Sequence, residues 1–437
     1  MNQQAYRANI LHFLDDPDKV GEPQSYEYFE DGLLIIEGGR ISAIGEASQL
    51  VAQVRKDEIF DYQGKLLLPG LIDTHTHYPQ TEMIASYGEQ LLEWLETYTF
   101  PTEAKFNDKT YALNIAELFL DELIKNGTTT ALVFPTVHPQ SVDAFFEQAE
   151  KRNLRMIAGK VLMDQNAPES LRDNAESAYS DSKELIERWH NCGRLKYAVT
   201  PRFAPTSSEA QLKAARVLLE ENPEVYFHTH LSESLNEVKW VKELFPNCRH
   251  YLDCYDRLGL LQERSIFAHC IHLEDSEWSR LEETESNISH CPTSNLFLGS
   301  GLFNLKRATT EGINVGLGTD VGAGNTFSLF KVMADAYKVQ QLNQNLFSAF
   351  KALYLATLGG ARCLKLDNHI GNFLPGKEAD FIVIDKKPTD FLAFRMKQCT
   401  TLLEELFTLI MLGDDRCIHA TYIAGEVAQP RIQDQEG

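Results

Sequence analysis

Apolar runs of strand length alternate with stretches of helical period between about residue 70 and residue 360. Eight runs are predicted to be strands: 66–75, 128–134, 155–163, 195–200, 226–230, 265–269, 287–291 and 314–320. Apolar residues recur at helical spacing between them, for example at 111–125, 180–190 and 209–221. Eight strands that alternate with helices over about 290 residues are typical of a (β/α)8 barrel, a TIM-like α/β fold.

A doubly wound parallel sheet is the structural alternative, because it also alternates strands with helices. Such a sheet normally carries a glycine-rich phosphate-binding turn after its first strand. The first predicted strand here runs into two histidines, a tyrosine and a proline instead. The pattern therefore favours the barrel.

The two ends of the chain have the pattern of a separate β-structure. Short β-like runs occur at 8–13, 33–45, 61–68, 379–385 and 420–427. The run at 33–45 is predicted to be a hairpin, because Gly38 and Gly39 supply the positive φ angles of a tight turn. We expect one small β-sandwich domain formed from residues 1–68 and 371–437, with the barrel at 69–370 inserted between its halves.

Composition narrows the range of partners. The 437 residues carry a formal net charge of −22, with 43% hydrophobic and 24% charged residues. Phosphate groups are bound by clustered Lys and Arg, so this charge argues against nucleic acid and anionic membranes as partners. A neutral or mildly polar small molecule is the expected substrate.

Cysteine usage and the lack of membrane signals predict a cytoplasmic protein. Eight cysteines lie between Cys192 and Cys417 without a Cys-x-x-Cys pair, which is typical of reduced thiols. No apolar run reaches the roughly 18 residues of a transmembrane helix. The first residues also lack the basic and apolar pattern of a secretory signal.

Histidines and an aspartate at the predicted strand ends indicate a metal site. His75 and His77 end the first strand two residues apart, so both side chains lie on one face of it. A catalytic zinc ion takes about three protein ligands and keeps one position open for water. His228 or His230 can add a ligand; we favour His230, which lies nearer the strand end, and expect His228 to be a buried histidine deeper in the barrel. Asp320 closes the last strand and is expected to bind the metal and take a proton from its water, with a helix N-cap as the alternative role.

Further polar residues fall at the carboxyl ends of the strands, where a barrel of this kind has its active site. Glu233 follows His230 at a spacing that lets it reach over the metal. His269 is expected to stabilise a tetrahedral intermediate, with a purely structural role as the alternative. Arg202 ends the fourth strand, where a second metal would need a modified lysine, so a one-metal site is predicted. His290 also ends a strand, and its role stays open.

Five motifs occur at 69–77 (PGLIDTHTH), 228–233 (HTHLSE), 268–270 (AHC), 289–295 (SHCPTSN) and 318–320 (GTD). They resemble the amidohydrolase superfamily, specifically its aminohydrolase branch, and the resemblance covers nearly the whole chain. It implies that His75, His77, His230 and Asp320 bind one zinc ion per subunit, with iron as an alternative that these ligand types also accept. It further implies a homodimer.

Additional motifs at 77–80 (HYPQ), 93–101 (EWLETYTFP), 159–164 (GKVLMD) and 200–205 (TPRFAP) narrow the resemblance to members that act on guanine. The implied reaction is hydrolytic deamination of guanine to xanthine and ammonia by a metal-activated water, with Glu233, His269 and Asp320 as catalytic residues. One alternative is deamination or dechlorination of another heterocycle, such as cytosine or a triazine. A more remote alternative is a metal-free interaction scaffold.

The same resemblance implies that Gln80, Arg202 and Phe203 contact the base. An arginine guanidinium matches O6 and N7 of guanine with two donors. Gln80 carries a donor and an acceptor for the N1 or N3 side, and Phe203 offers an apolar face to the ring. The structural alternatives are a surface salt bridge for Arg202 and ordinary core packing for Phe203.

Overall fold

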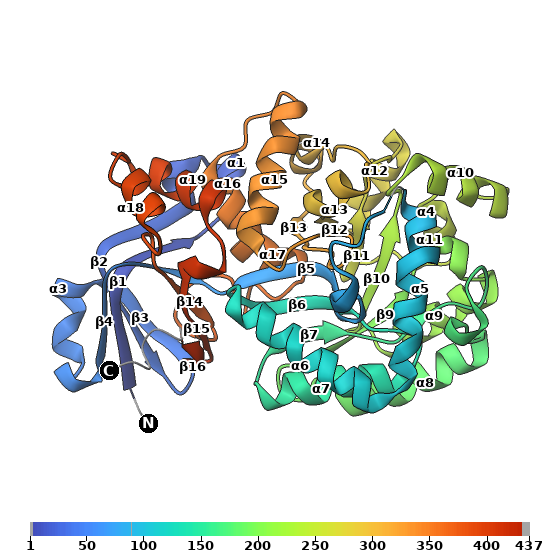
Figure 1. Cartoon of the computed structure of the whole chain (residues 1–437), viewed down its shortest axis with the longest axis horizontal. Helices are drawn as coiled ribbons and strands as arrows, with labels where there is room; N and C mark the ends of the chain where they lie inside the picture. Colours follow the sequence, from blue (N-terminus) through green and yellow to red (C-terminus); the bar gives the residue numbers. More distant parts are fainter. Residues whose placement is uncertain (1–2, 89, 431–437) are drawn as a thin grey trace.

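The chain folds into a barrel and a smaller β-domain built from both of its ends (Figure 1). The computed structural model describes residues 3–88 and 90–430. The outermost parts of the predicted β-domain, residues 1–2 and 431–437, lie outside the described residues. The small domain lies on the left of Figure 1 and the barrel on the right.

Eight parallel strands follow one another around the barrel in chain order: β5 (Leu71–His77), β6 (Thr128–Phe134), β7 (Arg155–Ala158), β9 (Lys196–Pro201), β10 (Tyr226–Leu231), β11 (Ser265–His269), β12 (Asn287–His290) and β13 (Val315–Leu317). The first strand meets the segment after the last one. His77 N donates to Val321 O at 3.0 Å, and Asp320 N donates to His75 O at 2.9 Å. A doubly wound sheet would instead reverse its strand order at a switch point, so the predicted (β/α)8 architecture is confirmed.

Amphipathic helices cover the outside of the barrel: α6 (Lys109–Lys125), α7 (Pro139–Lys151), α8 (Ala175–Trp189), α9 (Glu209–Glu221), α10 (Leu235–Leu244), α12 (Asp275–Glu283) and α15 (Leu329–Leu342). Side chains cap the first turns of several of these helices. Asp108 accepts a hydrogen bond from Thr110 N at 2.8 Å, and Ser234 forms a capping box with Glu237. Among the described helices, none is both long enough and apolar enough to cross a membrane.

Three barrel strands differ most from their predicted extents. The run at 66–75 is divided between β4 (Ile59–Pro69), which belongs to the small domain, and β5, which begins at Leu71. The run at 155–163 is interrupted after β7 and resumes as β8 (Val161–Leu162). At the interruption, a Cβ on Gly159 would lie 1.8 Å from the carbonyl oxygen of Ala198, so only glycine fits at this position. The last strand stops at Leu317, because Asp320 adopts a left-handed conformation with φ 49° that ends the extended chain.

The interior of the barrel is apolar at the amino-terminal ends of its strands. One fully buried cluster takes a side chain from six successive strands: Ile72, Leu132, Ile157, Ala198, Tyr226 and Ile266. The short helix α17 (Gly360–Cys363) adds Ala361 and Cys363 to the same cluster. Along their strands Ile72, Tyr226 and Ile266 precede the predicted site residues, so this apolar layer lies on the amino-terminal side of the predicted site.

The small domain is a single seven-stranded sheet in the order β16 (Glu426–Pro430), β15 (Ile418–Ile423), β14 (Phe381–Ile384), β4 (Ile59–Pro69), β1 (Gln3–Phe13), β2 (Tyr26–Glu37) and β3 (Arg40–Glu46). The sheet folds over on itself: the rings of Tyr6 on β1 and Tyr422 on β15 lie 5.0 Å apart although two strands separate them. The predicted hairpin turn has φ 57° at Gly38 and 75° at Gly39. Sequence patterns thus identified the β-domain from strands at both ends of the chain.

Buried ion pairs join the small domain to the barrel. Arg155, at the start of β7, donates from Nε to Glu378 Oε2 at 3.0 Å. Arg194 Nη2 lies 2.8 Å from the same oxygen and also pairs with Asp380. These contacts lie at the amino-terminal side of the barrel strands, so the opposite side is free to form a pocket.

Candidate active site

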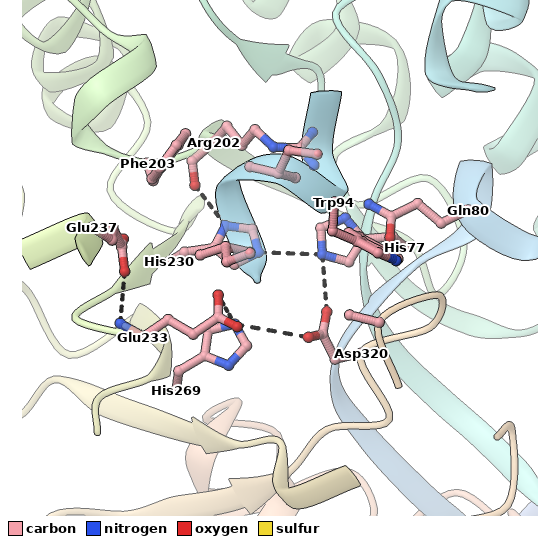
Figure 2. Close-up of a pocket in the computed structure, with 13 residues that line it drawn as sticks. His77, Gln80, Trp94, Arg202, Phe203, His230, Glu233, Glu237, His269 and Asp320 are labelled. Carbon is pink, nitrogen blue, oxygen red and sulfur yellow. Dashed lines mark hydrogen bonds and ion pairs between the residues drawn. The ribbon is translucent and has the colours of Figure 1, made fainter. Parts of the chain in front are cut away.

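Side chains from several strand ends converge on one pocket (Figure 2). The pocket is lined by His77, Gln80, Leu91, Trp94, Leu95, Arg202, Phe203, His230, Glu233, Glu237, His269, Asp320 and Ala323. His75 lies next to this lining, with its Nε2 atom 3.3 Å from His77 Nε2. The structure therefore brings together every residue for which the sequence predicted a role in the site.

Left-handed backbone turns direct several of these side chains. Ser232, His269 and Asp320 have φ values of 50°, 73° and 49°, each directly at or after the end of a barrel strand. Such conformations cost energy for residues other than glycine and are concentrated at functional sites. The turns end the extended chain and allow consecutive side chains to face the same pocket.

Ligand atoms of four residues gather at or near the spacing of a tetrahedral metal site, with four of their distances at 3.2–3.3 Å. Asp320 Oδ1 is 3.2 Å from the Nε2 atoms of both His75 and His77. His77 Nε2 is 3.3 Å from the Nε2 atoms of His75 and His230. Ligand atoms around a tetrahedral zinc ion lie about 3.3 Å apart, because each is about 2.0–2.1 Å from the metal. The group therefore fits a zinc-sized cation.

The hydrogen bonds of the outer ring nitrogens prepare the imidazoles to act as ligands. His230 Nδ1 lies 2.6 Å from the carbonyl oxygen of Arg202, which can only accept, so the proton is on Nδ1 and the lone pair on Nε2. His75 Nδ1 has a corresponding partner in His228 Nε2 at 2.8 Å. Lone pairs and the carboxylate of Asp320 thus face one point, where only a cation or donated protons can satisfy them.

Burial favours the neutral form of the His77 and His230 imidazoles. It is the main cause that lowers the pKa of His77 to about 4 and the pKa of His230 well below its usual value. Burial opposes the ionisation of Asp320, but His75, His77 and His269 outweigh it and hold the pKa of this carboxyl well below its usual range. Neutral imidazoles and an ionised carboxylate are the protonation states that bind zinc or iron.

His269 offers a second possible ligand set. Its ligand atom and those of His75, His230 and Asp320 all lie within 4.8 Å of one another. However, Asn295 Nδ2 donates to His269 Nδ1 at 2.8 Å, which leaves the ring proton on Nε2. That nitrogen is 3.4 Å from Glu233 and 3.8 Å from Asp320, so it is placed to donate a proton more than to bind a cation.

Glu233 is held from both ends beside His269. Its backbone N donates to Glu237 Oε2 at 2.8 Å, and its Oε1 atom accepts from the Ser300 hydroxyl at 3.2 Å. Burial, followed by the negative charges of Asp320 and Glu237, raises the pKa of Glu233 well above its usual value. A carboxyl group with a raised pKa can carry a proton into a reaction near neutral pH.

Arg202 and Gln80 share a buried carboxylate that the sequence did not reveal. Arg202 Nη1 donates to Glu103 Oε2 at 2.8 Å and Oε1 at 3.0 Å, and Gln80 Nε2 donates to Oε1 at 3.1 Å. Glu103 is fully buried at the end of α5 (Phe100–Glu103). The surface salt bridge considered for Arg202 is wrong, because its ion pair is buried.

Sequence reasoning also missed Trp94, Ser300 and Asn295. Trp94 lines the pocket and lies in the run at 93–101, which supports the family resemblance but from which no residue was given a role. Ser300 and Asn295 contact the site only through Glu233 and His269, and no spacing rule links them to those residues.

Comparison with known proteins agrees with this geometry. The model of the amidohydrolase family matches residues 66–428. A guanine deaminase of Escherichia coli is 52% identical over 97% of this chain and 96% of its own, and an E. coli guanine deaminase structure superimposes with a TM-score of 0.96 over 98% of this chain and all of its own. A guanine deaminase structure from C. acetobutylicum, with guanine bound in its active site, is 30% identical with a TM-score of 0.88, covering 98% of this chain and 100% of its own.

The family match spans most of the chain, including both the barrel strands and the later strands of the small domain. The similarity to the E. coli protein extends over almost the full length of both chains. The chain therefore belongs to the amidohydrolase family, as its strand-end motifs predicted.

Proposed function

We propose that the protein hydrolyses guanine to xanthine and ammonia. The observation that carries this proposal is the pocket itself, in which a metal-type cluster, a buried acid and a fixed arginine face one another. The full-length similarity to guanine deaminases, one of them solved with guanine in its active site, supports the choice of substrate.

We propose His75, His77, His230 and Asp320 as ligands of one zinc ion per subunit. The spacings of 3.2–3.3 Å support His77, whereas His269 lies 3.8 Å from Asp320 and carries its proton on the facing nitrogen. The same donors accept iron. When bound, the metal lowers the pKa of a water molecule toward about 7 and so supplies a nucleophile at neutral pH.

Three side chains then move the protons. Asp320 accepts a proton from the water that attacks C2 of guanine. Glu233 gives its proton to N3, and the His269 Nε2–H group donates to the oxygen that gains negative charge. The proton held by Asp320 leaves with the amine as ammonia. Glu233 recovers a proton from the new C2 hydroxyl as the C2 carbonyl of xanthine forms, so the residues return to their starting states.

The base is positioned by the opposite side of the pocket. Arg202 faces O6 and N7, Phe203 lies against the ring plane, and Gln80 meets the N1 or N3 side. The ring of Phe203 also packs edge-on against the ring of Trp240, with the ring centroids 6.1 Å apart, and this contact helps to hold Phe203 in place. Adenine has an amino donor where guanine has O6, and a donor facing Arg202 leaves buried groups unpaired at a cost of about 1–3 kcal/mol each.

An ultraviolet assay of zinc-loaded protein with guanine, adenine and cytosine tests the proposal. We expect rapid loss of guanine, with adenine and cytosine turned over at least 100-fold more slowly. Equal turnover of guanine and adenine would contradict the assignment of Arg202. Turnover of cytosine or a triazine in place of guanine would favour the other heterocycle deaminases.

We also propose a cytoplasmic homodimer. All eight cysteines are free thiols, which supports a reducing compartment. The dimer rests on the family resemblance, and light scattering coupled to gel filtration measures it directly; a mass near the 49.5 kDa of one chain would contradict it.

A further inference from the structure

Glu103 is a buried carboxylate that does not line the pocket but contacts both side chains assigned to the base. It accepts two hydrogen bonds from Arg202 Nη1 and one from Gln80 Nε2. Phe100, on the same short helix, lies 5.6 Å from the Arg202 guanidinium carbon and covers that group. One helix therefore holds the arginine by charge and by its ring face.

These contacts leave a defined set of donors for a ligand. Arg202 Nη1 donates its hydrogen bonds to Glu103. Among the described residues, none accepts a hydrogen bond from Arg202 Nε or Nη2. Those two nitrogens form the side edge of the guanidinium, which presents two parallel donors. This is the edge that can face a pair of neighbouring acceptors such as O6 and N7 of guanine.

The amide of Gln80 is fixed in the same way. Its Oε1 atom accepts from Gly322 N at 3.1 Å, and its Nε2 atom donates to Glu103 at 3.1 Å. Gly322 N can only donate and the carboxylate can only accept, so the two contacts agree on the orientation of the amide. The second N–H of Gln80 is left as a donor for an acceptor atom of the base.

We propose that Glu103 is a positioning residue that locks Arg202 and Gln80 in one arrangement and thereby sets which purine atoms the pocket recognises. The proposal rests on the proposed function. It adds that recognition of N7 and O6 depends on a carboxylate that does not touch the base. Since contacts to O6 and N7 persist from substrate to transition state, their loss raises KM more than it lowers kcat.

Two variants separate charge from geometry. Glu103→Gln keeps the size of the side chain but loses the charge, and Glu103→Asp keeps the charge but moves it back by one methylene. For both we expect KM for guanine to rise by about 10-fold or more, the effect of weakening a charged hydrogen bond, while kcat and bound zinc change little. Glu103→Asp retains the ion pair, so it remains informative if Glu103→Gln folds poorly.

The substrate analogue 7-deazaguanine has a C–H group in place of N7 and reports directly on the Arg202 contact. The wild-type protein should prefer guanine over this analogue in kcat/KM, and both Glu103 variants should reduce that preference. In an Arg202→Ala background the Glu103→Gln change should have little further effect, because residues acting through one another are not additive.

Asp173 provides a matched control. It is a buried carboxylate that also pairs with a cation, Lys160, and accepts from a glutamine, Gln211 Nε2 at 2.5 Å, but it does not line the pocket. Asp173→Asn should lower stability without changing KM or the preference for guanine.

Three results would overturn the proposal. The first is that both Glu103 variants keep the wild-type KM for guanine and the wild-type preference for guanine over 7-deazaguanine. The second is that both variants lose kcat and bound zinc to the same extent. The third is that the effects of Glu103→Gln and Arg202→Ala on kcat/KM are fully additive. Failure of the proposed function looks different, because the wild-type protein itself would then leave guanine unchanged.

Discussion

The two sides of the pocket treat buried charge in opposite ways. On the metal side, His75, His77, His230 and Asp320 bring lone pairs and a carboxylate together, with His77 Nε2 3.3 Å from the Nε2 atoms of His75 and His230 and Asp320 Oδ1 3.2 Å from those of His75 and His77. On the base side, the positive charge of Arg202 is already paired with Glu103 at 2.8 Å. The metal side requires a cation to satisfy its polar atoms, whereas the charge on the base side is balanced by a carboxylate of the protein itself.

The side chains on the two sides of the pocket are therefore held in place by different partners. A buried charge without a partner is costly, so the acceptors of the metal side are stable together mainly when a cation lies between them. The base side is preorganised, because Glu103 fixes Arg202 before a substrate arrives and less side-chain freedom is lost on binding. Substitutions on the metal side should therefore lower activity through loss of bound metal. Substitutions on the base side should instead lower the stability of the fold and the affinity for the base.

The largest effect is expected from His230→Ala. This change removes a proposed metal ligand whose tautomer is set by the Arg202 carbonyl, so tightly bound metal and activity should be lost together. Elemental analysis of the purified protein measures the metal. Added zinc should raise the melting temperature of the wild-type protein and leave that of the variant unchanged.

His228→Ala is the comparison for that experiment. His228 lies behind His75 and contacts it at 2.8 Å, so its loss should weaken metal binding about 10–100-fold without abolishing it. A His230→Ala protein that keeps its full metal while His228→Ala loses it would reverse the assignment of the third histidine ligand.

Glu233→Gln is expected to have the next largest effect. The amide keeps the size of the carboxyl group but cannot release a proton, so kcat should fall about 10²–10⁴-fold while metal stays bound. Parallel measurement of zinc and steady-state kinetics checks both halves of this statement. Turnover close to that of the wild type would exclude Glu233 as the proton donor.

On the base side, Arg202→Ala should lower stability as well as kcat/KM. It leaves the fully buried Glu103 carboxylate without its cation, a change that costs about 3–5 kcal/mol in comparable buried pairs. The double variant Arg202→Met, Glu103→Leu removes both charges and should recover most of that loss. Urea denaturation of metal-free protein measures the difference, and equal stability of the Arg202→Ala protein and the wild type would show that the pair contributes nothing.

The metal side was more predictable from the sequence than the base side. Residues two apart on a strand share a face, so the pair His75 and His77 and the strand-end position of Asp320 followed from local pattern alone. Glu103 could not be found this way, because it lies 99 residues before Arg202 and meets it only in the folded chain.

Details of the backbone were also beyond local pattern. The need for glycine at position 159 arises from the neighbouring carbonyl of Ala198, a contact that exists only in the folded chain. The left-handed conformations at His269 and Asp320 occur at residues that have no intrinsic preference strong enough to predict them. Strand periodicity predicted which residues reach the pocket, and tertiary contacts decide how each one is held.

The smallest effect is expected from Ser300→Ala, at the boundary between the two sides. The Ser300 hydroxyl donates to Glu233 Oε1 at 3.2 Å, while Oε2 of the same carboxyl faces His269 at 3.4 Å. Without the hydroxyl, Glu233 keeps its backbone anchor on Glu237 but can rotate, so kcat should fall about 10-fold or less with KM and metal unchanged. Ser279→Ala, on the exposed face of α12, is the control and should have wild-type kinetics. A rise in KM for Ser300→Ala with unchanged kcat would mean that the hydroxyl serves the base side, and that Glu233 is oriented by Glu237 and His269 alone.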